Sequence, residues 1–347
     1  MSDQQRRPGL GPHLIGQRVV VRRIVRGENG PSGGPALTDL LGVMESWASG
    51  VTTVRAESGQ VTAILVDDIV SGKPVPPRPS PRQRVSAKEA ELRATLSWPP
   101  LVTSPLGEWL LRASRGYTAR ANSVLAVGEP GLPFESAVEK VRDFYAAHDL
   151  PAWAQVVVDS ETHHGFESAG WMPARPAEAD TVFQIGSVSM ALRSVRRGAP
   201  AVRRSVVTGS TAGPDWLADD EDALAHGQPA LDVLEGPDEV AFASLTAGPE
   251  QRAEGPVGTV GAGGVIAKGR AAYARDWCGI SNIWVSPSHR REGLAVDVIG
   301  ALLEWGAQRG ASTAYLQTRG DNPGALALYA RLGFVAHHTY RYLRSPG

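Results

Sequence analysis

The segment CGISNIWVSPSHRREGLAVDVIGALLEWGAQR, residues 278–309, is the part of the chain that decides its fold. It begins with a β-rich run from Cys278 to Val285, which ends where Pro287 removes a backbone N–H from the strand ladder. From Leu294 to Arg309, apolar residues recur at the spacing of one helix face. The segment therefore predicts a strand, a loop and a helix in direct succession.

The loop between this strand and this helix has the composition of an anion site. The first N–H groups of a helix have no partner within the helix, and the helix dipole places partial positive charge there. Gly293 lets the backbone approach a ligand closely, while Arg290 and Arg291 add charged donors. A glycine-bearing turn before a helix is also common where nothing binds, so the loop alone predicts an anion site and nothing more specific.

Three spaced signatures extend this pattern. They are Val285-x-Pro287-x-x-Arg290-Arg291-x-Gly293-Leu294-Ala295, then Asn322-x-x-Ala325-x-x-x-Tyr329, and finally Gly333-Phe334. In this order they closely resemble the GNAT superfamily of N-acetyltransferases over about residues 205–345. The phosphate-loop pattern of that family, Arg/Gln-x-x-Gly-x-Gly/Ala, is met by Arg290, Gly293 and Ala295. The resemblance implies an α/β (α+β) GNAT fold with a mixed central sheet.

The resemblance also implies acetyl-CoA as the acyl donor. The end of the strand would offer backbone groups to the pantetheine arm, as one β-strand does to another. Amides of the loop and of the first helical turn would surround the pyrophosphate, and Asn322 would hydrogen-bond the cofactor near its thioester. The cofactor-binding residues implied in this way are Ile283, Trp284, Val285, Arg290, Arg291, Glu292, Gly293, Leu294, Ala295, Val296 and Asn322.

Tyr329 would carry the catalytic step that the resemblance implies, the protonation of the leaving thiolate of coenzyme A. Two plainer interpretations stay open. Tyr329 shares its helical spacing with Leu326 and Leu332 and could be a core residue. Asn322 could simply cap the helix that Pro323 begins.

A general base is the feature that this pattern lacks. Attack on a thioester needs a neutral amine, and relatives that acetylate protein N-termini have a glutamate five residues before the equivalent of Asn322. Here Gln317 stands at that position and cannot take a proton, and Ser281 and Asn282 stand in the strand where other relatives have glutamate. A water relay, an acid from residues 84–192 and an acceptor that is already neutral all remain open. An N-terminal or ribosomal-protein acetylase is disfavoured.

The resulting hypothesis is acetyl transfer from acetyl-CoA to a primary amine of a small molecule or of a protein lysine or N-terminus, by direct attack in a ternary complex. The alternative is a regulatory or scaffold protein that binds acyl-CoA without transferring the acyl group, which Gln317 favours. No metal is expected, because His337, His338 and Tyr340 are typical of a terminal strand. No acid or cysteine accompanies the two histidines at ligand spacing in the sequence.

The composition describes an ordinary globular protein. Its 347 residues suggest two or three domains, and its net charge of −1 gives no reason to expect nucleic acid or an anionic membrane as a partner. Cys278 alone cannot form an intrachain disulfide, which fits a reducing compartment. The first eight residues lack the apolar run of a secretory signal, and no apolar run is long enough for a membrane helix. We therefore expect a cytoplasmic protein.

Composition breaks divide the chain into five predicted parts. They are a small β-barrel over 1–72, a Pro-rich linker over 73–84, a degenerate GNAT-like half over 85–192, an Arg-rich linker over 193–204 and a GNAT domain over 205–347. A third hypothesis makes the barrel and the arginines a nucleic-acid module. We prefer a solvated linker, because no aromatic residues are interleaved with the arginines.

The predicted middle half has the elements of the same fold without its loop chemistry. Phe134 to Ala147 predicts an amphipathic helix, Ala154 to Val158 a buried strand, and residues 108–127 a pair of strands around Ser114-Arg115-Gly116. Its turn at residues 128–131 has no arginine and carries an acid, so we expect no phosphate there. This arrangement resembles the two-part acetyltransferases of actinobacteria.

Overall fold

The computed structural model of this chain describes residues 9–30, 33–56, 58–75, 81–175, 177–197, 204–247 and 264–346. It divides into two compact units, Met1–Ser80 and Pro81–Gly347. No helix among the described residues combines the length and the apolar character needed to cross a membrane.

The first unit is a five-stranded antiparallel sheet with the strand order β4-β3-β2-β1-β5. Its strands are β1 (Arg18–Asn29), β2 (Pro35–Ala48), β3 (Val51–Ala56), β4 (Val61–Leu65) and β5 (Ile69–Pro74). Alternate residues such as Val19 and Val21 are fully buried against Met44 and Val54, as expected for strands with one core face. The expected barrel is not closed, because no ladder joins β4 to β5 in the described part of this unit.

Strand β2 has no regular apolar alternation, because polar residues interrupt its pattern. One detail of this unit differs from expectation. Strand β5 runs on to Pro74, so the first residues of the expected linker pair with β1 instead. Residues 76–80 of that linker lie outside the described residues.

The second unit is built on a mixed twelve-stranded sheet, ordered β12-β13-β14-β15-β16-β11-β17-β9-β8-β7-β6, with β10 paired to β17. Its strands are β6 (Val102–Leu106), β7 (Trp109–Ala113), β8 (Val124–Leu125), β9 (Trp153–Val157), β10 (Met172–Pro173), β11 (Thr181–Ser187), β12 (Val207–Gly209), β13 (Val240–Thr246), β14 (Val265–Ala274), β15 (Trp277–Val285), β16 (Thr313–Arg319) and β17 (Val335–Arg344).

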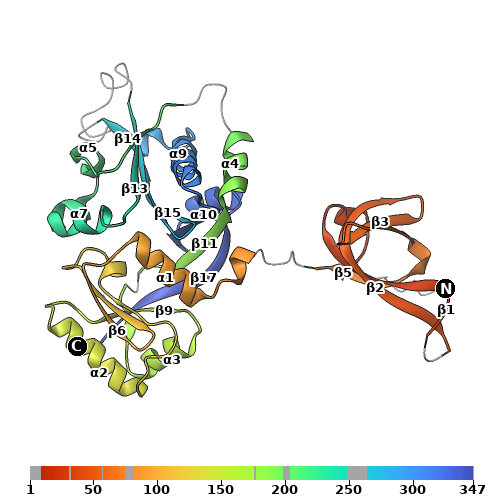
Figure 1. The fold of residues 1–347 in the computed structure, drawn as a ribbon, viewed down its shortest axis with the longest axis horizontal. Helices are drawn as coiled ribbons and strands as arrows, with labels where there is room; N and C mark the ends of the chain where they lie inside the picture. The colour runs from red at the N-terminus through yellow and green to blue at the C-terminus, as the bar shows by residue number, and fades with distance from the viewer. Residues whose placement is uncertain are drawn as a thin grey trace. The chain divides into compact units, whose positions relative to one another are not determined.

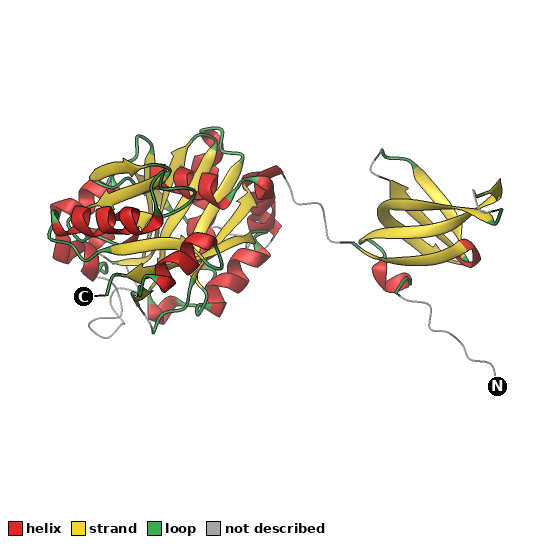
Figure 2. Ribbon diagram, turned by 90° about the horizontal axis from the view of Figure 1, so that it is seen from below, coloured by secondary structure: helices red, strands yellow, loops and turns green. Residues whose placement is uncertain are grey.

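Helices lie on both sides of these strands (Figure 2). They are α1 (Ala87–Ser97), α2 (Phe134–Ala146), α3 (Glu161–Ser168), α4 (Val188–Arg197), α5 (Pro214–Leu217), α6 (Glu221–His226), α7 (Gln228–Leu234), α9 (Leu294–Gln308) and α10 (Pro323–Arg331). Short 3-10 turns occur at Pro12–Leu14, Val66–Asp68, Pro81–Arg84, Ala119–Ala121 and Pro287–His289.

One strand joins the two halves of this unit. Strand β11, which comes from the middle of the chain, lies between β16 and β17 and is antiparallel to both. Figure 1 shows β11 beside β17. Strand β17 then pairs with β9, so the sheet continues from one half into the other. Residues 85–192 and 205–347 therefore share one sheet and belong to one compact unit.

The helix that follows β11 fixes this arrangement by close packing. Helix α4 packs on α9, where Gly300 makes room for Val195: a Cβ added at Gly300 would meet a Val195 methyl at 2.9 Å. Because α4 extends to Arg197, the first residues of the expected Arg-rich linker are helical. Residues 198–203 of that linker lie outside the described residues.

Most of the local predictions in this unit agree with the structure. The predicted helix at 134–147 and strand at 154–158 correspond to α2 and β9, and the segment 278–309 forms β15, a loop and α9. The expected strand pair around Ser114 forms as β7 and β8, which are antiparallel at Leu110 opposite Leu125, although β8 is only Val124–Leu125. Between the two strands, Asn122 accepts hydrogen bonds from the Ser114 and Gly116 amides, so a longer loop replaces a tight hairpin turn.

Candidate functional site

Strands β15 and β16 separate at the centre of the sheet. They pair in parallel only from Trp277 opposite Thr313 to Ile280 opposite Leu316, although β15 continues to Val285. A bulge on the other edge of β15, where it pairs with β14, places Asn282 in the left-handed region with a φ of 53°. The end of β15 therefore has no strand partner on its β16 side, which leaves backbone groups free for a ligand.

A pocket of about 1350 Å³ opens where the two strands separate. It brings together every site residue that the sequence analysis named, although their roles are not tested by this arrangement. The lining includes Ile283, Trp284, Val285, Arg290, Arg291, Glu292, Gly293, Leu294, Ala295, Val296, Asn322 and Tyr329.

The loop at the start of α9 has the geometry of an anion site. Arg291 and Gly293 both have positive φ, 71° and 86°, and the helix begins without a side-chain cap. The Val296 and Asp297 amides donate to the Gly293 carbonyl and begin the helix. A Cβ built at Gly293 has no heavy atom within 4 Å, so its surroundings are open space beside uncapped amides.

Arg204 is a contributor that the sequence analysis did not identify. It lies at the end of the segment that was expected to be only a linker, yet it lines the 1350 Å³ pocket. Its guanidinium donates to the Glu292 carbonyl at 3.1 Å and to Asp297 Oδ2 at 3.2 Å. This contact offsets the acid in the first turn of α9, which would otherwise repel an anion.

The position of Tyr329 is compatible both with a core residue and with a residue of the binding site. It is 7% exposed, packs edge-on against Phe334, and also lines the large pocket. Burial raises the pKa of Tyr329 above its ordinary value of 10.0, against the opposing effect of a hydrogen bond with Thr318. The phenol is therefore protonated at neutral pH and able to donate. Asn322 caps α10, because its Oδ1 accepts from the Ala325 amide at 3.1 Å.

A second pocket, of about 720 Å³, meets the first at the same place. Tyr315 of β16 lines only this smaller pocket, whereas Leu316 and Thr318 line the larger one. Because neighbouring residues of a strand point to opposite faces, the two pockets approach the sheet from opposite sides. They share Ile280, Ser281, Asn282, Gln317 and Arg319.

Gln317 has a fixed orientation at this junction. The Tyr340 hydroxyl donates to Gln317 Oε1 at 2.8 Å. The Gln317 amide nitrogen, Nε2, is buried and has no hydrogen-bond partner among the described residues. Gln317 therefore cannot act as a base, but it presents a free N–H donor where the two pockets meet.

An arginine held by ion pairs, Arg341, is among the residues that line the smaller pocket. Arg341 donates to both oxygens of Asp180, at 3.0 and 2.7 Å. On its other side it lies 3.4 Å from His163 Nε2 and 3.9 Å from Glu167. These contacts account for the charge of Arg341 within the protein, so it is not available to a ligand.

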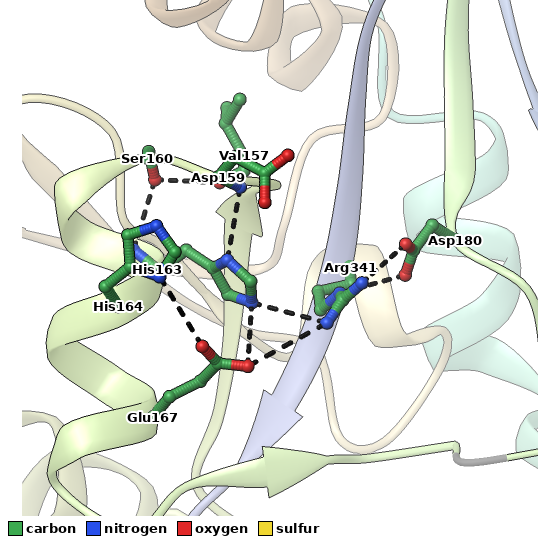
Figure 3. Close-up of polar contacts among 8 residues, drawn as sticks. All are labelled: Val157, Asp159, Ser160, His163, His164, Glu167, Asp180 and Arg341. Atoms are coloured by element: carbon green, nitrogen blue, oxygen red, sulfur yellow. Dashed lines mark hydrogen bonds and ion pairs between the residues drawn. The ribbon is translucent and has the colours of Figure 1, made fainter.

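The same region holds a group that could in principle bind a metal. Ligand atoms of Asp159, His163 and His164 lie within 4.8 Å of one another. However, the Asp159 amide donates to His163 Nδ1 at 3.2 Å, and the Arg341 guanidinium faces His163 Nε2 (Figure 3). Burial lowers the pKa of His163, which keeps it neutral. A guanidinium beside the ring nitrogen opposes a cation, so we assign this group to the support of Arg341.

The two histidines near the end of the chain have an acidic neighbour from a distant part of the sequence. Glu91 of α1, which is 1% exposed, contacts His338 Nε2 at 2.9 Å. His337 Nδ1 lies 2.8 Å from His338 Nδ1, and its Nε2 lies 2.7 Å from the Val85 carbonyl. The acid comes from another element far away in sequence, which is why spacing along the chain could not reveal it. None of these residues lines either pocket, and the contacts join α1 to β17.

Comparison with known proteins agrees with this architecture. Residues 86–343 match the family described as "Probable histone acetyltransferase Rv0428c C-terminal". The chain is 27% identical over 347 residues to the probable histone acetyltransferase Rv0428c of Mycobacterium tuberculosis, covering 97% of this chain and 95% of that protein. It is also 27% identical over 273 residues to the uncharacterized N-acetyltransferase YobR of Bacillus subtilis, covering 74% of this chain and 98% of the relative.

A solved structure supports the expected duplication of the fold. The tandem GNAT protein from the clavulanic acid biosynthesis pathway superposes with a TM-score of 0.50 at 15% identity, over 75% of this chain and 89% of its own. At that identity the likeness concerns the fold, and it includes both halves of the second unit. Since the family match spans well over half of the sequence, the chain belongs to the Rv0428c C-terminal family and, with it, to the GNAT superfamily of N-acetyltransferases.

Proposed function

We propose that this protein transfers an acetyl group from acetyl-CoA to a primary amine, with both substrates bound at once. The observation that carries the proposal is the meeting of two pockets, one on each face of the sheet, where β15 and β16 separate. The donor occupies the larger pocket and the acceptor the smaller one, and the reacting atoms meet at Gln317 and Asn282.

The larger pocket suits an acyl-CoA in three respects. The free edge of β15 from Ile283 to Val285 matches an extended pantetheine arm, which offers amide groups like those of a strand. The uncapped amides after Gly293 suit a pyrophosphate. Arg290 and Arg291 line the same loop, and Arg204 neutralises its acids. The bound donor supplies the activated thioester.

In the proposed reaction, the amine nitrogen forms a bond to the thioester carbonyl carbon and the bond from that carbon to sulfur breaks. The amine loses one proton, and Tyr329 donates one to the leaving sulfur. Gln317 Nε2 and free backbone amides of β15 donate hydrogen bonds at the junction, where negative charge develops on the carbonyl oxygen. Water carries the amine proton to Asp222, an acid of the smaller pocket that forms no ion pair with an arginine in the described structure.

The single cysteine takes no part in this reaction. Cys278 is fully buried, and burial raises the pKa of its thiol to about 12. A thiolate is the nucleophilic form of cysteine, so an acyl-enzyme at Cys278 is disfavoured at neutral pH. This supports direct transfer to the amine.

A non-catalytic acyl-CoA-binding protein is the second candidate. It is favoured by Gln317, which stands where a base is expected. It is also favoured by the ion pairs of Asp180 and Glu178 with arginines, because a paired carboxylate is a weaker base. The name of the M. tuberculosis relative points to a protein lysine as acceptor, whereas a pocket of this size also suits a small molecule.

Two linked measurements test the proposal. The release of free thiol from acetyl-CoA is followed over amines, amino acids, polyamines and basic proteins, and acetyl-CoA affinity is measured by calorimetry. Gly293→Asp should raise the Kd for acetyl-CoA by about 100-fold, since it puts a strained residue and a negative charge beside the uncapped amides.

Gly310→Asp is the matched control, because Gly310 also has a positive φ but lies at the far end of α9. Its affinity should stay within a few-fold of the wild-type value. Unchanged affinity in Gly293→Asp would refute the site. Binding of acetyl-CoA with no thiol release for any acceptor would favour the second candidate.

A further inference from the structure

The smaller pocket contains two arginines that no acid neutralises. Arg270 is buried, with 1% of its surface exposed, whereas Arg120 is half-buried and its Nε atom is buried without a hydrogen-bond partner. Both line the pocket, and neither forms an ion pair with a carboxylate within the described ranges. An uncompensated buried charge costs several kcal/mol, so proteins seldom keep one without a function.

The other arginines of this pocket have acidic partners. Arg341 is held by Asp180, and Arg175 by Glu178 at 3.3 Å. Arg319 contacts Asp321 at 2.7 Å and also Glu178 at 3.2 Å. Of the five arginines that line the pocket, three are paired with Glu178, Asp180 or Asp321, and the two without an acidic partner are Arg120 and Arg270. Asp222, the remaining acid of the lining, lies 3.3 Å from His226.

The two arginines lie against the same aromatic ring. The Trp98 ring centroid is 4.9 Å from the Arg270 guanidinium carbon and 5.4 Å from that of Arg120. Arg270 donates to the Leu234 and Ser97 carbonyls at 2.8 and 2.9 Å, so its place is fixed by the backbone. Burial lowers the pKa of Arg270 to about 10, and the charge of Arg120 acts in the same direction. Two cations against one ring favour an anion nearby.

Arg120 lines the same pocket as the residues of the junction. It shares that lining with Tyr340, whose hydroxyl donates to Gln317 where the two pockets meet. The free Nε of Arg120 and the free Nε2 of Gln317 therefore belong to two residues of one pocket. A ligand with an anion at one end and an amine at the other would contact both residues.

We propose that the acceptor is a small primary amine that carries a carboxylate, and that Arg120 binds this carboxylate with Arg270 beside it. This inference rests on the proposed transfer and adds the class of acceptor. The carboxylate neutralises the unbalanced charge, Trp98 and Tyr342 provide aromatic surface, and the amine reaches Gln317. A lysine in a basic protein tail is disfavoured, because its neighbouring cations meet arginines that already lack partners.

The experiment compares matched ligands that differ only in the carboxylate. The twenty L-amino acids and the amines formed by their decarboxylation, such as L-tyrosine with tyramine and L-histidine with histamine, are tested beside a lysine-rich peptide. Binding to the full-length protein with coenzyme A present is measured by calorimetry, and acetyl transfer is measured separately by thiol release. The variants are Arg120→Gln and, as the matched control, Arg115→Gln, which removes an exposed arginine of the same loop outside the pocket.

We expect at least one carboxylate-bearing amine to bind at least tenfold more tightly than its decarboxylated partner. Arg120→Gln should weaken that binding by about 10- to 100-fold, the effect of losing a charge-assisted hydrogen bond, and should leave the decarboxylated amine unaffected. Arg115→Gln should behave as wild type. Binding with this pattern but no thiol release would refute the transfer and leave the carboxylate site standing.

Three results would overturn the inference. One is tighter binding of the decarboxylated amines or of the lysine-rich peptide. The second is a carboxylate preference that persists in Arg120→Gln. The third is binding of no member of the set while coenzyme A binds normally.

Discussion

At the scale of single residues, the site depends on groups that the fold leaves without partners. The Gln317 Nε2 and Arg120 Nε donors are buried without hydrogen-bond partners in the described structure, the amides after Gly293 are uncapped, and all three residues line a pocket. Unsatisfied polar groups are costly in a folded protein, so these three mark places where a ligand can supply the missing partners. Tyr329 lines the larger pocket, and burial raises its pKa, so its phenol is protonated at neutral pH.

Tyr329→Phe tests the proposed acid. The change removes one hydroxyl from a buried ring, so acetyl-CoA affinity should change little, whereas kcat should fall by about 100-fold. The acid must be protonated to act, and burial raises its pKa above 10.0, so wild-type activity should decline only where pH passes this raised value. Phe has no proton to lose, and the variant should lack that decline. An unchanged kcat at pH 7.5 would remove the acid role.

At the scale of secondary structure, the sequence predicts those elements that are determined by neighbouring residues. The strand, loop and helix of residues 278–309 follow from periodicity, a proline and a glycine, and the structure has all three. The cap at Asn322 is equally local. The insertion of β11 between β16 and β17 has no such local cause, because no feature of residues 181–187 indicates which strands they pair with.

The candidate site shows the same division. The proposed donor-binding loop consists of consecutive residues, so the spacing of its motif predicted residues that line the larger pocket. The smaller pocket is assembled from α1, α6, the turn at Ala119–Ala121 and strands β10, β11, β14, β15, β16 and β17, and its lining runs from Ser97 to Tyr342. Arg120, Trp98 and Tyr340 have no common motif in the sequence, and only the folded sheet places them together.

Helix α1 offers a stability test of a contact that only the fold creates. Glu91→Gln removes the charge from the buried contact with His338 and should lower the free energy of unfolding by about 1–3 kcal/mol. Glu89→Gln is the control on the same helix, because Glu89 forms an exposed pair with Arg93 and should cost less than about 0.5 kcal/mol. Urea unfolding followed by fluorescence measures both. An equal decrease in the free energy of unfolding in both variants would show that the buried contact stabilises the fold no more than the exposed pair does.

At the scale of the whole second unit, one sheet carries two pockets that meet at a single opening. The proposed donor side is lined by the last third of the chain together with Ser194 and Arg204, and the proposed acceptor side is lined in nearly equal parts by this region and by the half that has no phosphate loop of its own. This division explains why that half is retained in the fold although its turn at Gly128 lacks the residues of an anion site. It supplies Arg120, Trp98 and Asp180 to the acceptor pocket.

The most direct test of this account is a crystal structure of the full chain with coenzyme A. The account predicts the pyrophosphate within hydrogen-bond distance of the amides of residues 291–296 and the pantetheine arm along Ile283 to Val285. It also predicts the sulfur between Tyr329 and Gln317. Coenzyme A bound elsewhere, or a sulfur that faces away from the junction of the two pockets, would contradict it.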